Sequence, residues 1–191
     1  MEEEIKLRDA IFRLRTTKFG NVVEVLLESH LKDLGAVVKN SKNRSYDREI
    51  DGLKDEIKGS VVRAEATLDL KNGNIIESIL NHETDRFVNF ADAKIIKWDS
   101  NIQQIKPELF NNLWYVLFFL DCVVIFKVNS SLLIPNTEIS YSPKQHRGNE
   151  GEGQFHVTRD KFQYHLNNHF VKTLTYREVY EKLNKKVISE N

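Results

Sequence analysis

Apolar positions at the start of the chain recur every three or four residues and predict two amphipathic helices, at residues 2–16 and 20–34. Gly35 marks the end of the second helix, because glycine readily adopts the left-handed conformation that closes a helix. The apolar face of this helix is expected to carry Val22, Val23, Leu26, Leu27 and Leu34. Glu24 falls at the border of that face, and Glu28 points further out.

The middle of the chain contains alternating and continuous apolar runs, which are typical of strands. The expected strands cover residues 46–51, 55–63, 93–98 and 122–128. The first two should pair as a hairpin whose turn contains Gly52. Residues 107–119 are interpreted as a helix that starts with Pro107 near its first position.

The last part of the chain is predicted to be a long loop followed by a helix. Residues 135–154 are rich in Pro, Asn, Gly and charge, which favours an ordered loop. Residues 175–187 form a helix with Thr175 as N-cap and Glu178 completing a capping box. The order of elements indicates an α/β fold with a central mixed β-sheet flanked by helices. The length of 191 residues suits a single domain, 1–191.

Composition excludes several other classes of protein. Apolar residues make up 40% of the chain, which argues against intrinsic disorder, and Cys122 is the only cysteine, which excludes a disulfide scaffold. The apolar run from Leu113 to Phe126 is interrupted by Asp121 and is too short to span a membrane. The charged N-terminus lacks the apolar core of a secretory signal, so we expect a cytoplasmic protein without membrane contact. Because 28 basic and 28 acidic residues cancel, nucleic-acid binding must rest on local clusters.

The most informative stretch is SYDREIDGLKDEIKGS, residues 45–60. With Gly52 and Leu53 at the tip of a hairpin, Asp47 would face Lys58, Glu49 would face Glu56, and Asp51 would face Lys54. Side chains alternate along a strand, so one face would collect Asp47, Glu49, Asp51, Glu56 and Lys58. Clustered carboxylates repel one another unless a hard divalent cation such as Mg²⁺ lies among them. A neighbouring lysine completes the equipment of metal-assisted hydrolysis.

Asp47, followed nine residues later by Glu56-Ile57-Lys58, resembles the Asp…(Asp/Glu)-x-Lys motif of the PD-(D/E)XK nucleases. The whole hairpin resembles type II restriction endonucleases in particular, although Tyr46 stands where the motif has proline. The resemblance implies a restriction-endonuclease-like core and Mg²⁺ as cofactor. It places the metal at Asp47, Glu56 and Ile57, and it makes Lys58 the residue that positions the attacking water.

Two flanking segments extend the resemblance to about residues 20–128. Glu24, in the segment Gly20–Glu24, resembles the helical residue that supplies an accessory carboxylate in this superfamily. Gln104, in the segment Asn101–Pro107, resembles the glutamine that lies near the metal in many restriction enzymes. The alternative for Glu24 is an ordinary glutamate at the flank of its helix, and the alternative for Gln104 is a surface amide.

A second set of residues competes with Asp47, Glu56 and Lys58 for the catalytic role, and we call the two sets the first and second catalytic frames. Asp51 and Glu65 are also suitably spaced, but Thr67 then stands where the lysine should be. The alternative to both frames is a solvated, charged hairpin without metal. His165 and His169 have the four-residue spacing of zinc ligands on a helix, but without further ligands a packed or exposed helix pair is the preferred interpretation.

Two segments are candidates for DNA binding. Lys39, Lys42 and Arg44 precede the hairpin and are suited to contact phosphates. Residues 141–157 combine glycines with side chains that read base edges. The base-reading candidates are Lys144, Gln145, His146, Arg147, Asn149 and Gln154.

The sequence is therefore expected to encode a Mg²⁺-dependent, sequence-specific double-stranded DNA endonuclease of the type II restriction class. By resemblance, its products carry 5′-phosphate and 3′-hydroxyl ends. Cleavage of both strands of a symmetric site favours a homodimer. The alternatives are a structure-selective nuclease of the same fold, a non-catalytic DNA-binding module, and a small interaction protein with a charged hairpin.

Overall fold

The structure is a computed structural model that describes residues 2–41, 45–65, 75–76, 86–144 and 151–189, the side chains of 186–189 excepted. The helices are α1 (Glu2–Phe12), α2 (Thr16–Asp33), α4 (Arg159–Asn168) and α5 (Tyr176–Ser189). The strands of the main sheet are β1 (Val38–Asn40), β2 (Arg48–Ile50), β3 (Leu53–Val61), β5 (Asn112–Phe118), β6 (Cys122–Asn129) and β8 (Phe170–Thr175). A second, two-stranded sheet contains β4 (Asp99–Ile105) and β7 (Gly153–Thr158). Short 3₁₀ turns cover Phe90–Asp92, Pro107–Leu109 and Ser130–Leu132.

The main sheet is mixed, with the strand order β1-β2-β3-β5-β6-β8. Strands β3 and β5 run parallel, and every other neighbouring pair is antiparallel. A parallel pair needs a long crossover, which the segment between β3 and β5 provides. The predicted α/β class, a central mixed sheet flanked by helices, is confirmed.

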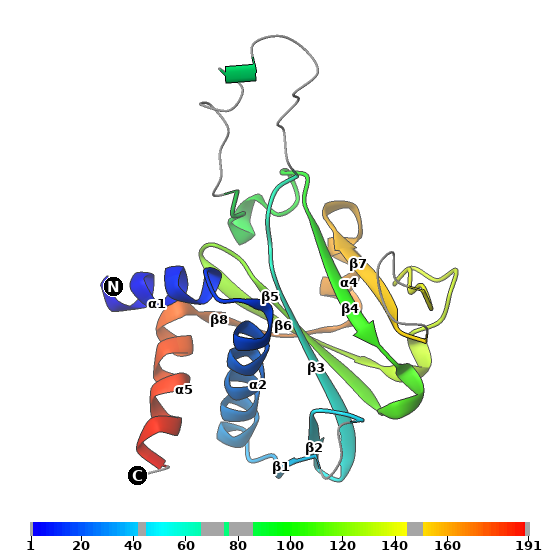
Figure 1. The fold of residues 1–191 in the computed structure, drawn as a ribbon, viewed down its shortest axis with the longest axis horizontal. Coiled ribbons are helices and arrows are strands. Elements are labelled where there is room, and N and C mark those ends of the chain that lie inside the picture. The colour runs from blue at the N-terminus through cyan, green and yellow to red at the C-terminus, as the bar shows by residue number, and fades with distance from the viewer. Residues whose placement is uncertain (1, 42–44, 66–74, 77–85, 145–150, 190–191) are drawn as a thin grey trace.

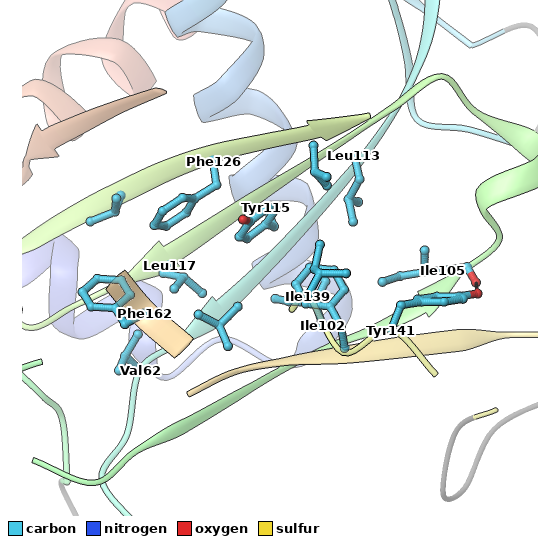
Figure 2. Close-up of a cluster of buried hydrophobic side chains, with 14 of the residues drawn as sticks. Val62, Ile102, Ile105, Leu113, Tyr115, Leu117, Phe126, Ile139, Tyr141 and Phe162 are labelled. Atoms are coloured by element: carbon cyan, nitrogen blue, oxygen red, sulfur yellow. Dashed lines mark hydrogen bonds between the residues drawn. The ribbon is translucent and has the colours of Figure 1, made fainter. Parts of the chain in front are cut away.

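The two faces of the main sheet are covered differently (Figure 1). Helices α1, α2 and α5 pack on one face, where apolar side chains of α2 meet those of β3, β5 and β6. The β4·β7 sheet and α4 cover the other face, and Figure 2 shows this second core. There Tyr115 and Phe126 of the main sheet face Ile102 of β4 and Phe162 of α4. The sheet is therefore buried between two apolar layers.

Several sequence predictions about local structure were wrong; Glu28, for example, was expected to point outward but is buried. Residues 107–119 form one 3₁₀ turn and strand β5 instead of a helix. Every residue of β5 is buried, and a strand that is buried on both sides lacks the alternation that distinguishes it from a buried helix. Residues 93–98 precede a strand, which begins at Asp99. Leu34, the C-cap of α2, is 68% exposed and lies outside its apolar face.

Other local predictions are confirmed. Gly35 follows α2 with a φ of 86°, and strand β6 lies where residues 122–128 predicted it. The capping box forms as expected, since the Thr175 amide donates to Glu178 Oε2 at 2.7 Å and the Glu178 amide donates to Thr175 Oγ1 at 3.2 Å. In the part of the chain that the structure describes, no helix combines the length and apolar character needed to span a membrane.

His165 of α4 and His169, the C-cap of this helix, are both buried, so the pair is packed and not exposed. His165 Nδ1 forms a hydrogen bond with the Tyr115 hydroxyl at 2.7 Å, and its ring stacks on Phe155. Burial lowers the pKa of His165 to about 3, with smaller contributions from His169 and Lys161. The native state therefore holds this imidazole in its neutral form at physiological pH.

This neutral histidine makes the stability of the protein sensitive to acid. Between pH 6.5 and pH 3 the unfolded chain binds a proton at His165 that the native state does not, so stability falls as pH falls through this window. His165→Gln removes this titrating group. It also removes a buried ring, so the variant is destabilised at pH 7. We expect its destabilisation at pH 7 to shrink by about 2–3 kcal/mol at pH 4.5, measured by urea unfolding at both values. A destabilisation that is equal at both pH values would contradict this prediction.

Candidate active site

The β2–β3 hairpin closes at Asp51 and Gly52, which have φ angles of 50° and 84°. Positive φ at both central positions is typical of a type I′ turn, for which Asp-Gly is a preferred pair. The observed register pairs Ile50 with Leu53 and Arg48 with Asp55. The predicted turn at Gly52–Leu53, and with it the predicted pairing, was therefore wrong by a slip of two residues. A shift of the register by two residues leaves each side chain on the same face of its strand, so the predicted side chains still share one face.

Asp47 lies directly before β2, where the chain still runs alongside β3. Its amide donates to the Asp55 carbonyl at 3.1 Å, and its Oδ2 accepts a hydrogen bond from the Ile57 amide at 2.8 Å. Extending the observed register by one pair sets Asp47 opposite Glu56. Lys58 Nζ forms an ion pair with Glu56 Oε1. The hairpin thus brings together Asp47, Glu56 and Lys58.

Alternation along β3 determines where these side chains point. In the parallel register Glu56 pairs with Leu113 and Lys58 with Tyr115, whose side chains belong to the core beneath β4 and β7. Ile57 and Gly59 face α2 instead. The side chains of Glu56 and Lys58 are 13% and 23% exposed, so the pair is largely enclosed but accessible to solvent.

Burial and like charge make this an unfavourable place for a carboxylate. Burial is the main cause that raises the pKa of Glu56 to about 7, and the negative charges of Asp47 and Glu24 raise it further. The Lys58 ammonium opposes this shift of the pKa. The pKa of Glu24 is raised as well, by burial and then by Asp47. Such repulsion among acidic groups is typical of a functional site.

Glu24 is held in this cluster by Arg48. Arg48 Nη1 lies 3.0 Å from Glu24 Oε2 and 2.9 Å from the Asp47 carbonyl oxygen. Arg48 Nε also donates to Glu28 Oε2 at 3.3 Å. One arginine therefore ties α2 to the start of β2, and no sequence motif indicated this role.

The oxygen donors around Asp47 fit a hard divalent cation. Within the described residues, no three acidic, histidine or cysteine side chains form a ready-made metal site. Asp47 and Glu56 offer two carboxylates, and Ile57 can offer its carbonyl oxygen. Amide and carbonyl of one strand residue point to the same edge, so the Ile57 carbonyl faces the edge at which its amide meets Asp47. Two carboxylates and a carbonyl are ligands that Mg²⁺ prefers, and a cation would relieve their repulsion.

Other candidate residues lie away from this cluster. Asp51 Oδ1 accepts from the Val37 amide at the hairpin turn, whereas Glu65 pairs with Lys97 beyond the far end of β3. The nine-residue strand separates them, so the structure does not bring the second frame together. Gln104 is exposed at a bulge of β4 with a φ of 59°, and no described contact links it to the Asp47 cluster.

The predicted DNA-binding residues are only partly described. Lys42, Arg44, Gln145, His146, Arg147 and Asn149 lie outside the described residues. Lys39 is exposed and lies 3.7 Å from Glu49, and Lys144 is also exposed. Gln154 is buried, and its Oε1 accepts from Asn101 Nδ2 at 3.0 Å. This placement in β7 argues against Gln154 as a base reader, because a tertiary contact occupies its side chain.

Comparison of the chain with protein-family models, with curated proteins and with solved structures gives no match. The functional interpretation therefore depends on the geometry and electrostatics of the site.

The raised pKa of Glu56 predicts a gain in stability when its charge is removed. Between pH 4.5 and about 7 the native state holds a proton at Glu56 that the unfolded chain has lost, so stability falls as pH rises through this window. Relative to the wild type, Glu56→Gln should gain about 2–3 kcal/mol between pH 5 and pH 8 without metal. Urea unfolding in EDTA at both pH values measures this. If the unfolding free energies of Glu56→Gln and the wild type differ by the same amount at both pH values, the pKa of Glu56 is not raised.

Proposed function

We propose that the protein is a Mg²⁺-dependent DNA endonuclease with a restriction-endonuclease-like core, active at Asp47, Glu56 and Lys58. The observation that carries this proposal is the hairpin, which holds two mutually repelling carboxylates beside an ammonium group. A purely structural salt bridge would need only Glu56 and Lys58. It would not need Asp47, whose negative charge raises the pKa of Glu56.

The chain's own residues have distinct roles in this proposal. Asp47, Glu56 and the Ile57 carbonyl would hold Mg²⁺, which supplies an activated water and neutralises phosphate charge. The hydrogen bond from the Ile57 amide fixes the orientation of the Asp47 carboxylate. Lys58 Nζ keeps Glu56 partly ionised and presents a positive charge where charge develops on the scissile phosphate. Glu24 adds negative charge that strengthens cation binding.

The substrate is proposed to be double-stranded DNA cut at a specific sequence, with 5′-phosphate and 3′-hydroxyl products. Exposed Lys39 and Lys144 provide cations for backbone contacts. A duplex has two strands of opposite direction, and the described part of each chain offers one such site, so we propose a homodimer as the cutting species.

Incubation of unmethylated plasmid and phage DNA with Mg²⁺, beside EDTA, tests this function. Discrete bands that require Mg²⁺ and can be religated with ligase would support a specific endonuclease with the proposed ends. Cleavage limited to branched substrates would favour a structure-selective nuclease instead. DNA binding without cleavage of any substrate would favour a non-catalytic module.

A further inference from the structure

A separate cavity lies at the carboxyl ends of the parallel strands β3 and β5. It has a volume of about 370 Å³ and lies between α1 and the residues that follow these strands. Arg8, Phe12 and Arg13 line it from α1 and the turn after it, and Arg63, Phe87 and Leu120 line it from the sheet side. In open α/β sheets, the crevice at the carboxyl ends of parallel strands is the usual place for a ligand.

The cavity carries an excess of positive charge. Three guanidinium groups line it with one carboxylate, that of Asp9. Arg8 Nε and Nη2 both contact Asp9 Oδ1 at 2.8 Å, and Arg8 Nη1 donates to the Leu120 carbonyl at 3.2 Å, so this arginine is part of the wall. Arg13 and Arg63 have no carboxylate partner within the described residues. Both side chains are exposed at the cavity, and they are the groups that we assign to an anion.

Arg63 lies over an aromatic ring at the wall of the cavity. Its guanidinium lies 5.2 Å from the centre of the Phe87 ring, which in turn packs against Phe12 with 4.5 Å between ring centres. A guanidinium above an aromatic ring still has N–H groups that can donate hydrogen bonds to a ligand. Two such N–H groups match two oxygens of a phosphate.

We propose that this cavity binds the phosphate group of a small organic phosphate, held by Arg13 and Arg63. Its less polar part would lie against Phe12 and Leu120. The volume lies within the range of small-molecule sites, roughly 300–1,000 Å³. Arg63 follows Lys58 by five residues, roughly 16 Å along an extended chain, so this site is distinct from the Asp47 cluster and does not depend on nuclease activity.

Calorimetric titration of the full chain with AMP and with inorganic phosphate, in EDTA and low salt, tests the proposal. We expect one AMP per chain, with affinity weakened at least ~10-fold by Arg13→Gln and by Arg63→Gln, since each variant loses a charged hydrogen-bond donor to the phosphate. Arg159→Gln, at an arginine of α4 paired with Asp160, is the matched control and should bind as the wild type does. Unchanged unfolding transitions would confirm that the variants fold.

A short DNA duplex shows whether the phosphate in the cavity belongs to a small molecule or to the DNA backbone. If AMP displaces the duplex, and Arg13→Gln and Arg63→Gln weaken both ligands, the cavity holds a backbone phosphate of DNA, and the proposal of a small-molecule ligand is overturned. If AMP binds without displacing the duplex, the ligand is a free phosphate ester. Absence of binding by both AMP and inorganic phosphate, or equal affinity in the wild type and the two variants, would overturn the proposal.

Discussion

Lys58→Ala is expected to lower Mg²⁺-dependent DNA cleavage by roughly 10²–10³-fold, the usual effect of removing one group that stabilises charge in a transition state. Lys58 contacts Glu56 and lowers the pKa of this largely buried carboxyl. Without the ammonium group, the pKa of Glu56 should rise above about 7, so cation binding should weaken as well. Initial rates of plasmid nicking at saturating Mg²⁺ measure the loss.

Lys54→Ala is the matched control for this variant. Lys54 belongs to the same strand but is exposed, opposite Glu49 and 5.8 Å from the Tyr46 ring. Its loss should leave the cleavage rate within about fivefold of the wild type, since an exposed charge contributes at most about 1 kcal/mol. Equal losses in both variants would mean that general positive charge at the hairpin, rather than the Lys58–Glu56 pair, supports cleavage.

Gly59→Ala is expected to destabilise the fold by about 1–3 kcal/mol, the cost of overpacking a filled core. A methyl group at this position would lie 2.5 Å from Val23 Cγ2 and 3.1 Å from a ring carbon of Phe19. Val23 is buried, and its branched side chain has little rotamer freedom to move away. The clash would push α2, which carries Glu24, away from the strand of Glu56 and Lys58, so cleavage should fall too.

Gly20→Ala provides a control of opposite sign. Gly20 lies inside α2, and nothing lies within 4 Å of the position of an added methyl group. Alanine should therefore stabilise the helix by about 0.5–1 kcal/mol. Urea unfolding of both variants measures the difference. A neutral Gly59→Ala would show that α2 does not require close contact with β3.

Sequence information was sufficient where one residue type determines the local geometry. Thr175 and Glu178 predicted the start of the last helix, and Gly35 predicted the end of α2, because each satisfies backbone groups within its own turn. The alternation of polar and apolar residues placed Asp47, Glu56 and Lys58 on one face even though the predicted register was wrong. An even slip does not exchange the faces of a strand.

Sequence information was insufficient where a distant segment determines a residue's environment. Arg48 bridges Glu24 and Asp47 only because α2 packs beside β2, and Gly59 matters only because Val23 contacts it. Burial of β5 on both faces removed the alternation that marks a strand. Gln154 resembled a base reader until its contact with Asn101 was known. These features depend on tertiary packing, which local patterns do not encode.

Cleavage of unmethylated plasmid DNA at millimolar Mg²⁺ by the wild type, Asp47→Asn and Asp51→Asn tests the central claim most directly. The two variants make the same chemical change at opposite ends of one short strand, and they separate the two catalytic frames. We expect the wild type and Asp51→Asn to cut and Asp47→Asn to lose cleavage. Cleavage that survives in Asp47→Asn, or a folded wild type that cuts no DNA substrate, would contradict the assignment of Asp47 to a nuclease site.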